Sequence, residues 1–149
     1  MKTGFYWCAY HDFLLIFLSN PKQRLKTIEQ DKPRNERKIR KSEMQRVKGK
    51  LPKEVIITGK KCTKAFEVYF KAFQVYFKAL KVHIEFPHRS RIICHLEETK
   101  RAFEKSYNVF VNAINKHKDY LEKLHREEVP NSCWDGERLD FEKISDETG

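Results

Sequence analysis

The chain has 149 residues, about the length of one domain, and its 31 Lys and Arg residues exceed its 21 Asp and Glu residues by ten. Charged residues make up 35% of the chain, against a usual share of about 25%, and there are only five glycines and five prolines. So few turn-forming residues exclude a collagen-like chain and disfavour a β-sandwich or barrel.

The N-terminal segment, residues 1–21, contains a dense apolar run from Phe5 to Leu18. His11 and Asp12 interrupt this run, so it is too short and too polar for a transmembrane helix of about 20 residues. A secretory signal is also disfavoured, because the segment lacks a small-residue cleavage site. One use for the run is as a third helix that packs back on the rest of the chain.

The basic excess of the chain lies in residues 22–61, which carry fifteen Lys and Arg residues against five Asp and Glu residues. This segment begins directly after Pro21, has few apolar residues and contains Pro33 and Pro52. A self-repelling block of this kind cannot bury enough apolar surface to fold by itself. The sequence therefore predicts a disordered, flexible basic arm, helical only transiently.

Basic arms bind polyanions by releasing counterions, with strong salt dependence and little sequence specificity. We expect this arm to bind nucleic acid non-specifically through its densest cationic part. The residues concerned are Arg34, Arg37, Lys38, Arg40, Lys41, Arg46, Lys48 and Lys50. An anionic membrane, an acidic protein and an inert linker are the alternatives, because a charge block names only the sign of its partner.

A seven-residue repeat follows the arm, with units that start at Lys64, Lys71 and Lys78. An odd period moves a side chain to the other face of a strand at every repeat, whereas a helix returns it to nearly the same azimuth. The repeat therefore predicts a helix over about residues 64–86. Its polar stripe is only about 100° wide, so its apolar surface needs more than one neighbouring helix.

A second helix is predicted over about residues 91–128, with apolar positions in register over five heptads. Because Pro87 separates the two helices, we expect an antiparallel hairpin over residues 62–129, in an all-α, coiled-coil-like bundle. The second helix alone cannot cover the wide apolar surface of the first. This favours a homo-oligomer, such as a four-helix bundle formed by two copies. The residues expected to drive assembly are Phe66, Phe70, Phe73, Phe77, Leu80, Ile93, Leu96, Phe103, Tyr107, Phe110, Ile114, Leu121 and Leu124.

Candidate chemical sites are weak in this sequence. Four residues near the expected turn have metal-ligating side chains: His83, His88, Cys94 and His95. Their spacing fits no standard zinc finger, and Glu122 with His125 is better explained as a salt-bridged surface pair than as half of a di-iron site. No phosphate loop or catalytic motif is present. We therefore expect no enzyme activity, cofactor, metal or small-molecule substrate. Residues 130–149 form an acidic tail, which we expect either to dock on a partner or on the basic arm of the chain, or to be a frayed end.

The four cysteines, at positions 8, 62, 94 and 133, form no C-x-x-C pair, which is typical of reduced thiols in an intracellular protein. The basic cluster from Arg37 to Lys41 favours the nucleus over the cytoplasm. The leading interpretation is a non-enzymatic oligomeric scaffold that binds nucleic acid. The alternatives are a peripheral membrane protein, with its aromatic helix in the lipid interface, and a reading frame without a selected function.

Overall fold

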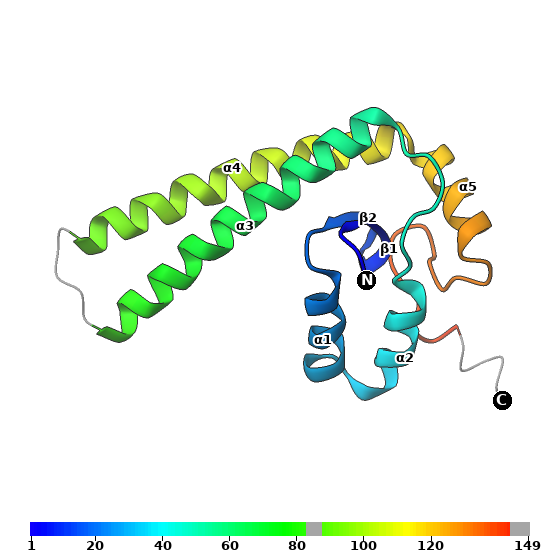
Figure 1. Ribbon diagram of the computed structural model, residues 1–149, viewed down its shortest axis with the longest axis horizontal. Helices are drawn as coiled ribbons and strands as arrows, with labels where there is room; N and C mark the ends of the chain where they lie inside the picture. Colours follow the sequence, from blue (N-terminus) through cyan, green and yellow to red (C-terminus); the bar gives the residue numbers. More distant parts are fainter. Residues whose placement is uncertain (83–87, 144–149) are drawn as a thin grey trace. The chain divides into compact units, whose positions relative to one another are not determined.

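The computed structural model describes residues 1–82 and 88–143, and the chain divides into two compact units. The first, here called the mixed unit, comprises Met1–Leu51 and His117–Gly149, and the second, the hairpin unit, is Pro52–Lys116. The elements in chain order are β1 (Gly4–Tyr10), β2 (Phe13–Leu18), α1 (Pro21–Asp31), α2 (Arg34–Glu43), α3 (Lys53–Val82), α4 (His88–Lys116) and α5 (Lys118–Glu128) (Figure 1). The predicted all-α fold class is wrong, because the mixed unit contains a two-stranded antiparallel sheet.

The N-terminal apolar run forms a β-hairpin and not a third helix. Strands β1 and β2 pair antiparallel from Gly4 opposite Leu18 to Tyr10 opposite Phe13, around a turn at His11 and Asp12. Aromatic and branched side chains favour such strands, because they pack well on a pleated surface. Nearly all of β1 is buried, so its sequence shows an unbroken apolar run and no alternation.

The predicted disordered arm is also wrong, since residues 22–61 lie in α1, α2, a short connection and the first turns of α3. The prolines begin helices instead of preventing them: Pro21, directly before the segment, opens α1, and within it Pro33 precedes α2 and Pro52 precedes α3. The sparse apolar residues of the segment are anchors that reach the sheet. Ile28 and Met44 join Tyr6, Ala9 and Leu18 in one buried cluster.

The connection after α2 runs along the free edge of β1. The Trp7 amide donates to the Gln45 carbonyl at 2.8 Å, and the Val47 amide donates to the Phe5 carbonyl at 2.9 Å. Further along, both carboxylate oxygens of Glu128 accept from backbone amides, Oε1 from Lys48 at 2.6 Å and Oε2 from Gly49 at 2.9 Å. The end of α5 therefore holds this basic stretch in place.

The expected helix over 91–128 is divided at His117, where α4 ends and α5 begins. Neither proline nor glycine causes this break. Instead, Leu121 and His125 of α5 are fully buried in the mixed unit, so tertiary packing overrides a continuous heptad pattern.

The described part of the acidic tail, residues 130–143, is folded onto the mixed unit. The Leu139 amide donates to the His11 carbonyl at 2.7 Å, and the Phe141 ring lies 4.8 Å from the guanidinium carbon of Arg40. Cys133 and Leu139 are buried. These residues therefore anchor the described part of the tail to the unit, and it is not a frayed end.

In the hairpin unit, α3 and α4 lie side by side over their length (Figure 1). They run antiparallel, because the first turn of α3 meets the last turn of α4 through an ion pair of Glu54 with Lys116 at 3.3 Å, while Phe66 meets Phe103 midway. The α3 side of the seam uses the small residues of the repeat, with Ala72 and Ala79 buried. No helix among the described residues is long and apolar enough to cross a membrane.

Candidate functional site

Three features of the structure have a chemistry of their own: a basic face on α2, an apolar face on α3 and a buried polar cluster in the mixed unit. On α2, the exposed side chains of Arg34, Lys38 and Lys41 follow the spacing i, i+4, i+7, which places them on one face of the helix. The opposite face buries Ile39 and Glu43. Lys41 also forms an ion pair with Glu29 of α1.

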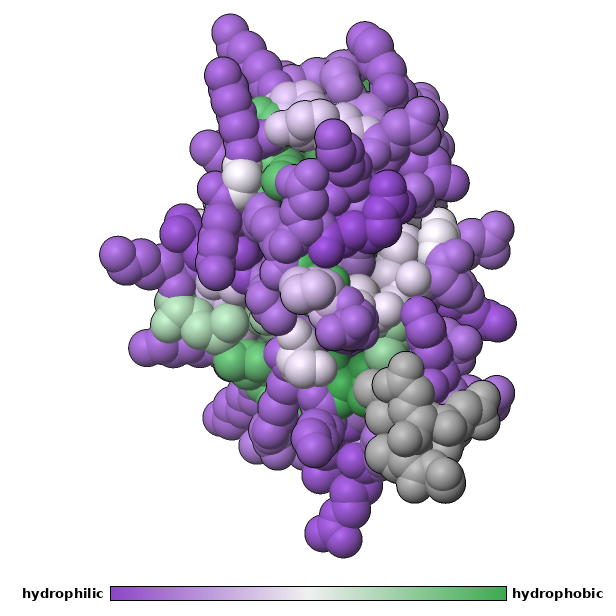
Figure 2. Space-filling view, turned by 90° about the vertical axis from the view of Figure 1, so that its right-hand side faces the viewer, coloured by the Kyte–Doolittle hydropathy of each residue, from purple (hydrophilic) through white to green (hydrophobic). Residues whose placement is uncertain are grey.

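The other cations expected to bind nucleic acid are placed differently. Arg40 is buried, bonded to Glu36 at 2.7 Å and stacked on Phe141, so it serves the fold. Arg37 is half-buried and donates to the carbonyl of Lys32. Exposed side chains in the connection after α2 are those of Arg46, Lys48 and Lys50. The surface drawn in Figure 2 is mainly hydrophilic, with hydrophobic side chains in small separate areas.

The apolar face of α3 consists of five exposed side chains in a row. They are Phe66, Phe70, Phe73, Phe77 and Leu80. At about 100° per residue they share one side of the helix, next to the Ala and Tyr positions that face α4. Phe73 remains 40% exposed and Phe77 50% exposed, and their rings contact each other at 5.8 Å. Val68 and Val75 form a second exposed row on another side of α3.

The remaining residues expected to drive assembly are divided among three environments. Phe110 is buried, while Leu96, Phe103, Tyr107 and Ile114 are half-buried on α4. Ile93 is exposed. Leu121 and Leu124 belong to α5, where Leu121 lies in the core of the mixed unit and therefore contributes nothing to a surface of the hairpin unit.

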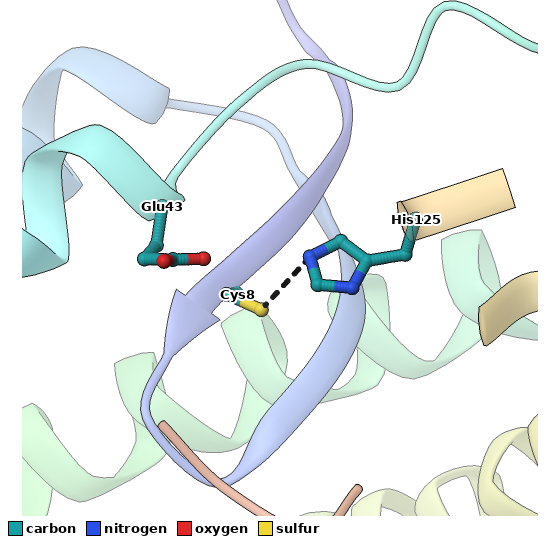
Figure 3. Close-up of side chains that lie close together, drawn as sticks. All are labelled: Cys8, Glu43 and His125. Atoms are coloured by element: carbon teal, nitrogen blue, oxygen red, sulfur yellow. Dashed lines mark hydrogen bonds between the residues drawn. The ribbon is translucent and has the colours of Figure 1, made fainter. Parts of the chain in front are cut away.

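The buried polar cluster comprises Cys8, Glu43 and His125, from β1, α2 and α5 (Figure 3). One potential ligand atom of each lies within 4.8 Å of the other two, and Cys8 Sγ is 3.7 Å from His125 Nε2. Solvent reaches only 1% of Cys8, 4% of Glu43 and 1% of His125. A carboxylate and an imidazole, two groups that prefer water, are thus held inside the unit beside a thiol.

Local structure explains how each group enters the cluster. One additional residue in β1 shifts the register between Trp7 and Tyr10, and Cys8 there has a φ of 42°, in the left-handed region. Such strain persists only where the surroundings determine the conformation. Glu43 ends α2 and accepts from the Cys133 amide at 2.7 Å and the Ser132 hydroxyl at 2.5 Å. The Trp7 ring packs against that of His125 at 5.1 Å.

Burial dominates the electrostatics of the cluster. Desolvation, with smaller contributions from Glu43 and Cys133, raises the pKa of the Cys8 thiol far above its usual value. Desolvation lowers the pKa of His125, although Glu43 and Glu128 oppose this shift and Arg126 adds to it. The pKa of Cys133 is raised by burial and by its contact with Glu43. Without a further cation, the thiols and the imidazole are therefore neutral at pH 7.

The arrangement differs from that of a nucleophile–base–acid relay. In a relay the carboxylate holds the histidine nitrogen that faces away from the nucleophile. Here Cys8 and Glu43 approach the same side of the His125 ring (Figure 3). The Cys8 thiol is also buried and has a raised pKa, whereas a reactive cysteine is accessible and has a lowered one. The three groups instead converge on one point.

Of the metal-ligating candidates considered from the sequence, His125 belongs to the buried cluster, but its partners there, Cys8 and Glu43, were not among them. His83 lies outside the described residues, and Cys94 is exposed on α4. Glu122 pairs with Lys118 at 3.9 Å as a surface residue, but His125, expected beside it at the surface, is buried. Sequence reasoning missed the cluster because 35 residues separate Cys8 from Glu43 and 82 more separate Glu43 from His125, so no local spacing shows it.

The chain was compared with known protein families, sequences and structures. No protein family, curated protein sequence or solved structure matches the chain.

Proposed function

We propose that this protein is a scaffold that self-associates through the apolar face of α3 and binds nucleic acid non-specifically through the basic face of α2. The observation that carries the proposal is the row of exposed aromatic side chains from Phe66 to Phe77, continued by Leu80. Contiguous exposed apolar surface on a soluble protein typically marks an interaction site.

A second copy of the chain fits this face because the repeat makes it self-complementary. If two α3 helices pair antiparallel about a two-fold axis at Phe73, Phe66 lies opposite Leu80 of the other copy, and Phe70 lies one residue away from the position opposite Phe77. Such an isologous contact closes a dimer and leads to no further growth. The same register brings Glu67 of each copy near Lys78 of the other, so the flank of the contact is complementary in charge. Each copy contributes α3 and α4, which gives a four-helix arrangement.

Replacing Phe73 by Glu should convert the dimer into a monomer. The substitution places two carboxylates at the two-fold axis, while in the single chain the residue is already 40% exposed, so the hairpin unit should keep its helix content. Size-exclusion chromatography with light scattering on the full chain measures the mass, and circular dichroism measures the helicity.

The matched control is Val75→Glu, which adds the same charge two residues away on the other exposed row. We expect this variant to remain dimeric. A monomeric wild-type chain, or a dimer lost equally in both variants, would contradict assembly through the Phe row.

The nucleic-acid part of the proposal depends on α2. Arg34, Lys38 and Lys41 span two turns of one exposed face, which suits contact with phosphates along a backbone. Binding by charge alone predicts weak sequence preference and strong dependence on salt.

Changing Arg34, Lys38 and Lys41 together to Gln should weaken binding to duplex DNA at low salt. The slope of log affinity against log salt concentration should fall by about 3, because about 0.9 counterion is released per phosphate contact. Fluorescence anisotropy with a labelled duplex at several salt concentrations gives both quantities.

A triple change of Lys64, Lys71 and Lys78 to Gln removes the same charge from α3 and serves as the control. Its slope should stay close to that of the wild type. Equal losses in the two triple variants would mean that net charge, and not the α2 face, determines binding.

A further inference from the structure

We propose that Cys8, Glu43 and His125 form a zinc-binding site that joins β1, α2 and α5 in the mixed unit. The site is independent of the self-association and nucleic-acid binding described above. It rests on the convergence of the three side chains, on their burial and on the charge that they leave uncompensated.

The geometry of the cluster matches that of a tetrahedral ion. Zinc lies about 2.3 Å from a cysteine sulfur and about 2.1 Å from a histidine nitrogen, which at tetrahedral angles places the two ligand atoms about 3.6 Å apart. Cys8 Sγ and His125 Nε2 are 3.7 Å apart, and a Glu43 oxygen completes a triangle with no side above 4.8 Å. Only small movements of side chains would bring all three atoms to bonding distance from one centre.

The charge of the cluster favours a cation. Buried carboxylates are as a rule paired with a cation or bound to a metal. Glu43 is only 4% exposed, and none of the ion pairs found among the described residues includes it. The nearest arginine on the same helix, Arg40, pairs with Glu36 instead. Around the cluster, the positive charges of Arg126 and Lys143 are balanced by the negative charges of Glu128 and Asp140, so neither cation is left over to neutralise Glu43. A divalent ion would supply the missing positive charge at the centre.

The surroundings also hold the ligands in place, as the outer residues of a metal site do. The Ser132 hydroxyl and the Cys133 amide fix the Glu43 carboxylate, and the Trp7 ring limits the rotation of His125. Cys133 donates to Glu43 through its backbone amide, but its sulfur is not in the group of ligand atoms that lie within 4.8 Å of one another, so its thiol would have to move to take the fourth position.

The donor set selects the metal. One or two sulfurs, an imidazole nitrogen and a carboxylate oxygen suit Zn²⁺, whereas Ca²⁺ and Mg²⁺ prefer sites made of oxygen. On binding, a Zn–S bond replaces the S–H bond of each ligating thiol, and the released proton passes to solvent. Since solvent barely reaches the cluster, the site has the closed character of a structural zinc site.

The test uses the full, untagged chain, reduced and stripped of metal with EDTA. After addition of Zn²⁺ and dialysis, elemental analysis should find one zinc ion per chain. Co²⁺ in its place should give the near-ultraviolet absorption of a thiolate–metal bond. Cys8→Ser and Glu43→Gln should each lower zinc affinity at least about tenfold. The control chain carries Ser at both Cys62 and Cys94 and should bind zinc as the wild type does.

A second measurement needs no change at the site and remains decisive if a variant fails to fold. Zinc should protect Cys8 of the control chain from alkylation by iodoacetamide in moderate urea, with the modified peptides identified by mass spectrometry. No stoichiometric zinc in the wild-type chain, loss of zinc in the control chain, or alkylation of Cys8 at an unchanged rate would each overturn the proposal.

Discussion

Replacing Trp7 by Ala should lower the free energy of unfolding of the mixed unit by about 4 kcal/mol, the largest effect we expect from one substitution. Trp7 is 0% exposed, packs on His125 and donates from Nε1 to Glu128 Oε1 at 3.2 Å. Its removal leaves a cavity between β1 and α5 and takes away one partner of the carboxylate that holds the connection after α2.

Urea unfolding followed by tryptophan fluorescence can measure this effect, because the second tryptophan, Trp134, lies in the same unit and reports on it in the variant. The matched control is Trp134→Ala, observed through Trp7, which should cost less because Trp134 is only half-buried and its indole nitrogen has no hydrogen-bond partner. Equal losses in the two variants would contradict the central place of Trp7.

Replacing Phe110 by Ala should destabilise the hairpin unit by about 3 kcal/mol. Phe110 is 1% exposed on the side of α4 where Thr99 and Ala113 are also buried, so its ring contributes to the pairing of the two helices within one chain. The loss should be visible as a lower midpoint of thermal unfolding, followed by far-ultraviolet circular dichroism. The measurement is made at protein concentrations too low for dimerisation.

The comparison variant is Phe73→Ala. Its ring is exposed, so in the dilute single chain its removal should change the free energy of unfolding by less than about 1 kcal/mol. Phe110→Ala and Phe73→Ala therefore separate stability from assembly. If Phe110→Ala weakened only the dimer and left the stability of the dilute chain unchanged, the assignment of Phe110 to the seam within the chain would be wrong.

The helical state of the repeat and of the segment after it was predictable because the evidence is local, but the bounds were not, since α3 begins at Lys53 and α4 ends at Lys116. A seven-residue repeat predicts a helix whatever surrounds it, and Pro87, which lies outside the described residues, predicts from the sequence alone that the two helices are separate. The facing side of α3 was harder to predict, because apolar residues cover most of its circumference. The helices meet along the small Ala72 and Ala79, which permit close approach, while the larger Phe73 and Phe77 remain outside.

The errors arose where distant parts of the chain decide local structure. Ile28 and Met44 are too few to fold residues 22–61 by themselves, but the β-hairpin supplies the surface that buries them. The hairpin itself was missed because a short apolar run, buried on both faces, has no alternation to distinguish strand from helix. The break at His117 likewise depends on where Leu121 and His125 pack.

The buried cluster shows the same limit in its strongest form. Cys8 is one cysteine in an apolar run, Glu43 one acid in a basic segment and His125 one histidine in a charged helix. None of these contexts indicates a shared site, and only the fold brings the three together.

The order of the units along the chain has a consequence for folding during synthesis. The mixed unit is discontinuous, since residues 52–116 stand between its two parts. When the ribosome has released the first 51 residues, Trp7 and Cys8 still lack α5 and the segment around Cys133, and they must wait for more than 65 further residues. The hairpin unit, whose contacts are closer in sequence, can form during that delay. The packing of α3 on α4 brings Glu54 and Lys116, at the two ends of the unit, close together. Much of the entropy cost of closing the long loop is therefore met when the hairpin unit folds, before the mixed unit assembles.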